Sequence, residues 1–223
     1  MTALAGPRDP AQPLITLLDG PVRIELSGAT AANWAAKTAH FLTVQGSPQR
    51  VGILLPLHWQ AVTLLIGITD TGATAVIARD VADLAGCELA FTTAALSGEV
   101  LDAVDEVVAV SLAPFGGRAA GPGGLPAMVL DAGEELPIQG DHYRGPGGGK
   151  VERGGLPTSV EPADLGVEDR VLLTGTLTDS LPALLATLVA GASMLLCPGE
   201  VPSADQLASE GVTARGSALP RTP

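Results

Sequence analysis

Hydroxyl and carboxylate side chains are concentrated in one segment that could bind a ligand, Thr174-Gly175-Thr176-Leu177-Thr178-Asp179-Ser180. It lies between a predicted parallel strand and a predicted helix, and α/β sheets bind ligands where their strands end. Free N–H groups at a helix N-terminus favour anions. The ligand-binding candidates are therefore Thr174, Gly175, Thr176, Thr178 and Asp179. The alternative interpretation is that Thr178 or Asp179 only caps the helix, with Pro182 in its first turn.

A second segment, Gly145-Pro146-Gly147-Gly148-Gly149-Lys150, has the composition of a loop that holds phosphate groups. Glycines allow backbone N–H groups to approach an anion, and a lysine adds positive charge. A Walker A loop, however, has Ser or Thr after its lysine, and Val151 stands there in this chain. The segment therefore predicts a flexible linker rather than a phosphate site.

The other residues of catalytic type form no recognisable constellation. The three histidines have no spacing that suggests a shared metal, and no Gly-x-Ser-x-Gly elbow is present. An acidic cluster before a predicted strand is explained by a solvated face. We therefore predict no catalytic residue and no metal site. The residues considered are His40, His58, His142, Asp102, Asp105 and Glu106.

The charge balance excludes one class of partner. The chain of 223 residues has a net charge of −12 with only 12 Lys and Arg, which are scattered along its length. No basic stripe is available to neutralise phosphates, so nucleic acid is not an expected partner. We expect a small molecule or another protein instead.

The cysteines and the apolar segments indicate a cytoplasmic protein with no membrane span. Cys87 and Cys197 lie far apart in apolar segments, as reduced core thiols do. The N-terminus lacks the charged and then apolar profile of a signal peptide. The uncharged stretch from Ser180 to Gly199 is bounded by prolines and divided by Gly191, which predicts a buried helix followed by a strand.

The elements that must position these residues alternate between strands and helices, which predicts an α/β fold with parallel or mixed sheets flanked by helices. A hairpin at Leu14–Leu18 and Val22–Leu26 and a helix from Thr30 to Gln45 come first. Two related βαβ units follow, each with a glycine after its helix. The first comprises Val51–Leu55, His58–Thr71 and Thr74–Ala78; the second comprises Arg170–Leu173, Asp179–Ala190 and Ser193–Cys197.

Shorter elements lie between the two units, and one more follows the second unit. The pattern predicts a helical turn, three short strands, a weak helix and a final short helix. They span Val81–Leu84, Glu88–Thr92, Ala94–Val104, Glu106–Val110, Ala127–Leu130 and Ser203–Glu210. Composition then divides the chain into a first α/β subdomain at residues 1–139, a Gly/Pro-rich linker at 140–161 and a second, incomplete α/β subdomain at 162–223.

The order of these elements resembles the N-terminal part of the adenylate-forming superfamily, the AMP-dependent synthetases and ligases that include acyl-CoA synthetases. The resemblance covers about Leu14 to Leu196. Its motifs are Asp19-Gly20, the helix from Asn33-Trp34 to Leu42, Arg50-Val51-Gly52-Ile53-Leu54-Leu55-Pro56, Thr71-Gly72-Ala73, Asp169-Arg170-Val171-Leu172-Leu173 and Leu188-Val189-Ala190-Gly191-Ala192.

Several motifs of that superfamily have no counterpart here. Its Ser/Thr/Gly-rich phosphate loop ends in Pro-Lys-Gly, and nothing between Ser111 and Asp169 reproduces it. The resemblance would place further ATP motifs beyond Gly199, and neither Lys37 nor Lys150 matches the superfamily's catalytic lysine. Only Thr178 and Asp179 fall near its substrate-pocket segment.

The resemblance implies a truncated adenylate-forming-like protein without adenylation activity, acting as a small-molecule-binding or interaction module. ATP or AMP as a cofactor is implied by the resemblance alone. Two alternatives stay open. One is a component of an AMP-forming acyl or aryl ligase that is active only with a partner. The other is an unrelated α/β nucleotide-binding protein that uses the turn from Thr174 to Ser180.

Overall fold

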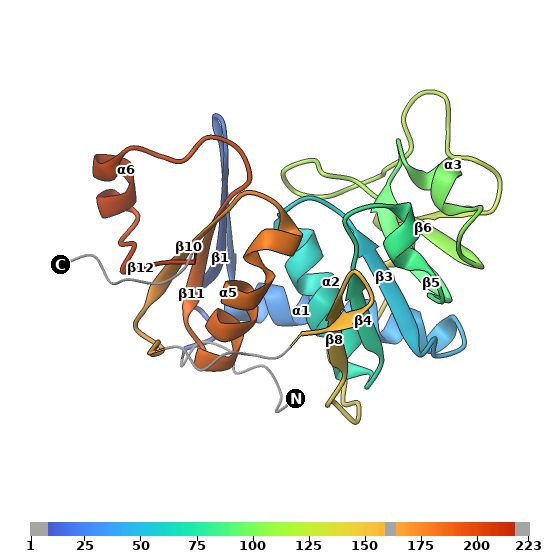
Figure 1. Ribbon diagram of the computed structural model, residues 1–223, viewed down its shortest axis with the longest axis horizontal. Coiled ribbons are helices and arrows are strands. Elements are labelled where there is room, and N and C mark those ends of the chain that lie inside the picture. The colour runs from blue at the N-terminus through green and yellow to red at the C-terminus, as the bar shows by residue number, and fades with distance from the viewer. Residues whose placement is uncertain (1–8, 159–163, 217–223) are drawn as a thin grey trace. The chain divides into compact units, whose positions relative to one another are not determined.

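The computed structural model describes residues 9–158 and 164–216 (Figure 1). The chain divides into two compact units, and the second is discontinuous in sequence. The first unit consists of residues 32–55 and 60–158, and the described residues of the second are 9–31, 56–59 and 164–216.

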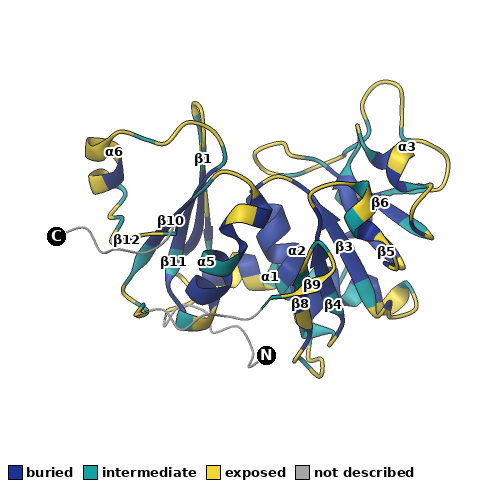
Figure 2. Cartoon of the chain, viewed as in Figure 1, coloured by how far each residue is buried: buried dark blue, intermediate teal, exposed yellow. Residues whose placement is uncertain are grey.

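The first unit is built on a sheet of seven strands, in the order β7-β6-β5-β3-β4-β8-β9. All neighbouring pairs are parallel except the terminal pair of β8 with β9. Figure 2 shows the central strands as buried, which explains their continuous runs of apolar residues. The strands are β3 Arg50–Leu54, β4 Thr74–Ile77, β5 Leu89–Thr93, β6 Glu106–Val110, β7 Val129–Asp131, β8 Lys150–Arg153 and β9 Leu156–Pro157.

Glycines allow the helices of this unit to approach closely. A Cβ on Gly67 of α2 would lie 2.5 Å from the Ala35 carbonyl oxygen of α1, and one on Gly52 of β3 would lie 2.4 Å from the Leu84 side chain. On the sheet, Phe91 contacts Phe41 of α1. The helical elements are α1 Gly28–Val44, α2 Trp59–Asp70, the 3-10 turn η1 Val81–Leu84, α3 Ser97–Val100 and α4 Ala132–Glu135.

The second unit is built on a sheet of five strands, in the order β12-β10-β11-β1-β2. Only the β1–β2 hairpin is antiparallel. Helix α5 lies against β10 and β11, while Leu207 of α6 packs with Leu172 and Leu195 of these strands. The elements are β1 Pro13–Asp19, β2 Val22–Ser27, β10 Arg170–Thr174, α5 Leu177–Ala190, β11 Ser193–Cys197, α6 Ala204–Ser209 and β12 Ala214–Arg215.

The predicted α/β class with two βαβ units is confirmed. The pairs β3–β4 and β10–β11 are parallel, and each pair is connected by one helix. Gly72 follows α2 with φ of +87° and Gly191 caps α5 with φ of +69°, a conformation that favours glycine. None of the helices within the described ranges is long and apolar enough to span a membrane.

The compact units divide the chain differently from the predicted subdomains at 1–139 and 162–223. The N-terminal hairpin belongs to the second sheet, because β1 pairs with β11. The predicted linker at 140–161 contains β8 and β9, which extend the first sheet beyond β4; its residues 159–161 lie outside the described part. The predicted helix at Ala94–Val104 is reduced to the four residues of α3.

Candidate functional site

The turn from Thr174 to Ser180 joins the carboxyl end of β10 to the N-terminus of α5, as predicted. Thr176 is the N-cap, whereas the alternative interpretation gave this role to Thr178 or Asp179. Its Oγ1 accepts the Asp179 N–H at 3.1 Å and donates to Asp179 Oδ2 at 2.7 Å. The helix begins earlier than expected, because Thr176 captures the N–H of the third helical residue.

Two further side chains of this turn also form hydrogen bonds within it. Thr178 Oγ1 lies 2.9 Å from Thr176 Oγ1, and Ser180 Oγ donates to the Thr174 carbonyl at 2.7 Å. Gly175 has φ of +80°, which turns the chain from strand to helix. These contacts make the turn a capped helix start, and ligand binding there stays a prediction.

The glycine-rich segment packs on the C-terminal end of α2. The N–H groups of Gly147 and Gly149 donate to the carbonyls of Asp70 and Thr69, at 3.0 and 3.1 Å. A Cβ on Gly149 would lie 2.4 Å from the Ala73 carbonyl oxygen, so the two backbones are in direct contact. Two of its N–H groups therefore satisfy helix carbonyls.

The histidines do not converge. His40 Nε2 lies 2.7 Å from the His142 carbonyl oxygen, a contact to the backbone rather than to the second ring. His58 is buried against the Trp59 ring, and burial lowers its pKa to about 4. Within residues 9–158 and 164–216, no three His, Cys, Asp or Glu side chains are grouped as a metal site requires.

Both cysteines are free and buried, in agreement with the prediction of core thiols. Burial raises the pKa of Cys87 and of Cys197 to about 11. A thiol with such a pKa is almost wholly protonated at neutral pH, so neither sulfur is an activated nucleophile.

A charged network that the sequence did not indicate crosses the second sheet. Arg23 of β2 and Arg170 of β10 both donate to Glu210, which follows α6, at 2.8 Å from Arg23 Nε and 3.1 Å from Arg170 Nη2. The same Nη2 donates to Thr16 of β1 at 2.7 Å. The Arg23 hydrogen bonds, reinforced by Arg170, hold the pKa of Glu210 below its usual range.

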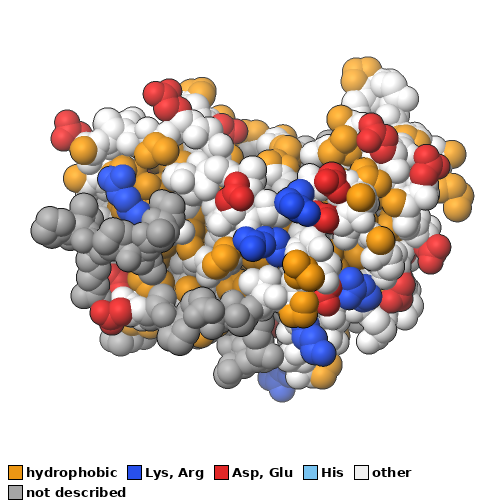
Figure 3. Space-filling view, in the orientation of Figure 1, with side chains coloured by type: hydrophobic (Ala, Val, Ile, Leu, Met, Phe, Trp, Pro, Cys, Tyr) orange, Lys and Arg blue, Asp and Glu red, His pale blue; other side chains and the backbone are white. Residues whose placement is uncertain are grey.

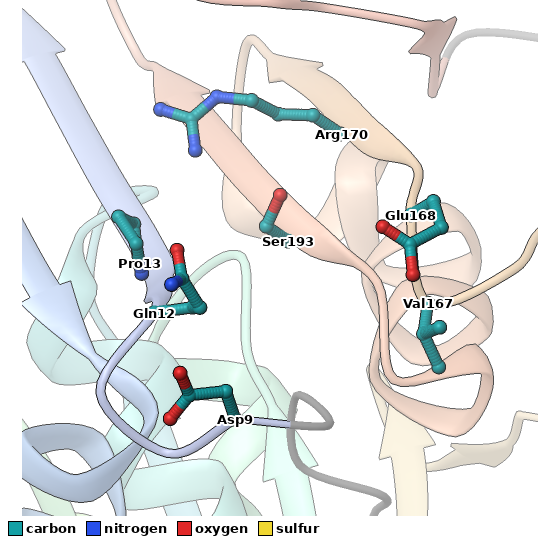
Figure 4. Close-up of a pocket in the computed structure, with 7 residues that line it drawn as sticks. All are labelled: Asp9, Gln12, Pro13, Val167, Glu168, Arg170 and Ser193. Atoms are coloured by element: carbon teal, nitrogen blue, oxygen red, sulfur yellow. The ribbon is translucent and has the colours of Figure 1, made fainter.

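Beside this network, a cavity of about 460 Å³ opens at the amino ends of β1, β10 and β11 (Figure 4). It lies at the edge of the sheet opposite to the Thr174–Ser180 turn, because these three strands are parallel. The cavity was not predicted from the sequence, because ligand sites of α/β sheets are expected at the carboxyl ends of the strands. Its wall includes Asp9, Gln12, Pro13, Glu168, Arg170 and Ser193.

Surface charge is mixed rather than segregated. On the face drawn in Figure 3, Lys and Arg side chains lie among Asp and Glu side chains. Several basic groups are paired with acids, as in Arg50 with Glu152 at 3.0 Å and Arg79 with Asp83 at 3.0 Å.

Comparison with known proteins identifies the family. No family profile matches the chain. A protein of Mycobacterium tuberculosis (strain ATCC 25618 / H37Rv), described as a TIGR03089 family protein, is 37% identical over an alignment of 227 positions, which covers 92% of this chain and 91% of the relative. This chain belongs to the TIGR03089 family.

The solved structures that the TIGR03089 chain resembles are acyl-CoA synthetases, as the predicted resemblance implied. The Brucella canis acyl-CoA synthetase superposes with a TM-score of 0.75 at 15% identity, over 93% of this chain and 45% of its own. The N-terminal domain of FACL13 from Mycobacterium tuberculosis gives 0.61 at 16% identity, over 92% and 58%. Acetoacetyl-CoA synthetase from Streptomyces lividans gives 0.67 at 18% identity, over 92% and 40%.

The TIGR03089 chain thus spans about half the length of the synthetases it resembles, from 40% to 58% in these three. The TIGR03089 chain has the fold of their N-terminal part. At such low identity the likeness concerns the fold alone.

Proposed function

We propose that this chain uses the N-terminal scaffold of an adenylate-forming enzyme without catalysing adenylation, as a module that binds a small molecule or a protein. The observation that carries the proposal is the hydrogen bonding of the glycine-rich segment from Gly145 to Lys150. The N–H groups of Gly147 and Gly149, which a phosphate loop would direct at the nucleotide, donate to carbonyls of α2.

Transfer of an adenylyl group requires charge stabilisation around the reacting phosphorus, and positioned N–H groups, lysine or arginine and metal ions supply it. Lys150 begins β8 and is held in parallel register with Thr74 of β4. Its backbone is therefore fixed in the sheet rather than in a loop around a phosphate. The cytoplasmic localisation expected from reduced cysteines is part of the same proposal and is supported by two free, buried thiols.

The test is ATP–pyrophosphate exchange by the full chain with a panel of carboxylic acids of varied chain length. An active acyl-CoA synthetase assayed in parallel controls for the reagents. We expect exchange at the level of the blank. Exchange above the blank with any acid, retained after further purification, would refute the proposal.

Exposed apolar side chains favour a second candidate function, a ligase component that becomes active with a protein partner. Phe115 is 86% exposed and Met128 is 84% exposed, both in the long connection between β6 and β7. Large apolar side chains in water favour association. The test is to purify the chain with its partners from the native host and repeat the exchange assay, and a partner-free, inactive chain argues against this function.

A further inference from the structure

The cavity at the amino ends of β1, β10 and β11 contains one cationic side chain that is held in place from behind. Arg170 is 12% exposed, and its Nη2 is anchored on Thr16 at 2.7 Å and on Glu210 at 3.1 Å. Its buried Nε meets no hydrogen-bond acceptor within the part of the chain described here. The guanidinium therefore has donor capacity beyond these partners, and an anionic oxygen matches it.

Carboxylates form the other part of the wall. Figure 4 shows Asp9 and Glu168 on different sides of the pocket from the Arg170 guanidinium, with the polar ends of Gln12 and Ser193 between them. Asp9 Oδ1 accepts the Ala11 N–H at 2.9 Å, and a carboxylate offers about four acceptor positions, so capacity is left for a ligand. An ammonium group, with three donors and a positive charge, matches this side.

We propose that this cavity binds a small zwitterion that carries one ammonium and one carboxylate group. The carboxylate lies toward Arg170 and the ammonium toward Asp9 and Glu168. The volume of about 460 Å³ is within the range of small-molecule sites, roughly 300 to 1,000 Å³. A ligand with a single charge makes the contacts of only one side of the pocket, which provides the selectivity.

This inference rests on the small-molecule binding of the proposed function and assigns it a site and a ligand class. The site is separate from the Thr174–Ser180 turn, which lies at the opposite edge of the same sheet. Binding in this pocket involves no step of nucleotide chemistry. The result of a binding experiment is therefore independent of the result of the pyrophosphate exchange assay.

The experiment is isothermal titration calorimetry of the full chain with glycine, β-alanine and γ-aminobutyrate, which vary the distance between the two charges. Propionate and propylamine are the singly charged controls. Asp9→Asn and Glu168→Gln each remove one exposed carboxylate of the wall, and Asp205→Asn removes an exposed acid in the first turn of α6 as a matched control. Thermal unfolding without ligand verifies that each variant folds.

We expect at least one zwitterion to bind saturably, with the singly charged compounds at least about tenfold weaker. Asp9→Asn and Glu168→Gln should each weaken the zwitterion several-fold, and Asp205→Asn should leave the affinity unchanged. No saturable binding at about 10 mM, equal binding of the singly charged compounds, or undiminished affinity in both wall variants each overturns the proposal. Such a result leaves the conclusion on adenylation untouched, whereas pyrophosphate exchange would refute that conclusion and not the pocket.

Discussion

Replacing Glu210 by glutamine should destabilise the second unit, because this carboxylate joins α6 to two strands of the sheet. It accepts hydrogen bonds from Arg23 Nε at 2.8 Å, Arg23 Nη2 at 3.1 Å and Arg170 Nη2 at 3.1 Å. Glutamine keeps the shape of the side chain but removes the charge. The variant therefore leaves the largely buried Arg170 guanidinium without its carboxylate.

The contacts of Glu210 with Arg23 and with Arg170 contribute differently to the free energy of unfolding. The Arg23 side chain is 47% exposed, so its pair with Glu210 has the value of a surface ion pair, about 0.5 kcal/mol. The Arg170 side chain is only 12% exposed, and losing a charge-assisted bond at such a site costs roughly 1.5 kcal/mol or more. The sum is about 2 kcal/mol, or a decrease in Tm of about 4 to 8 °C.

The assay is urea unfolding followed by circular dichroism at several pH values, with Glu200→Gln as a control at an exposed acid of the same unit. Because the folded-state pKa of Glu210 is lowered, its contribution is complete above the ordinary glutamate pKa of about 4.3 and is lost as pH falls below that value. The difference between wild type and Glu210→Gln should thus be full at pH 7 and should shrink progressively as pH falls below about 4.3 and through the lowered folded-state pKa. Equal stabilities of the Glu210→Gln and Glu200→Gln variants at pH 7, or a difference that does not shrink at acidic pH, would contradict this account.

Three further predictions concern packing and protonation. Gly133→Ala would place a Cβ 2.1 Å from the Gly117 carbonyl oxygen and should cost roughly 2 kcal/mol in urea unfolding, whereas Gly98→Ala, in an equally short helix with open space around it, should cost less than about 0.5 kcal/mol. The NMR titration of His58 should have its midpoint near pH 4; since this pKa is lowered from 6.5, stability should fall as pH decreases from 6.5 to 4, and a midpoint above pH 6 would refute the assignment. The two cysteine thiols, whose pKa is raised to about 11 by burial, should react with iodoacetamide at pH 8 only after unfolding, and rapid labelling of the native protein would refute their burial.

Local sequence patterns were sufficient to predict most elements of the fold. The strand from Glu106 to Val110 and the helical turn from Val81 to Leu84 were predicted with their observed bounds. Both are short segments whose apolar period and flanking residues leave few alternatives. β11 also has its predicted bounds, and α5 ends where Gly191 predicted, but β10 extends one residue further than predicted, to Thr174, and α5 begins two residues earlier, at Leu177.

Elements that depend on distant partners were not predicted. Lys150-Val151-Glu152-Arg153 contains a single apolar residue, and the glycines before it suggested a linker. The segment forms a strand because Val151, which is 3% exposed, is buried beside β4 and because Glu152 forms an ion pair with Arg50. Neither contact is visible in the local sequence.

The turn from Thr174 to Ser180 was correctly placed between a strand and a helix, but its chemistry could not be predicted from residue types alone. Threonine and aspartate are favoured both at ligand sites and at N-caps, and only the distances from Thr176 to Asp179 show that these groups satisfy one another. The pocket with Asp9 and Ser193 could not be predicted, because these residues meet only through the pairing of β1 with β11.

The pairing of β1 with β11 also constrains the order in which the protein can fold during synthesis. Residues Ile15 to Leu17 have no neighbour on one side until Met194 to Leu196 have left the ribosome. Contacts so distant in sequence form slowly, and the first unit can fold in the meantime because its residues lie between them. Until β11 is available, the N-terminal hairpin has one unpaired apolar edge, and an unpaired strand edge is a site at which chains can aggregate.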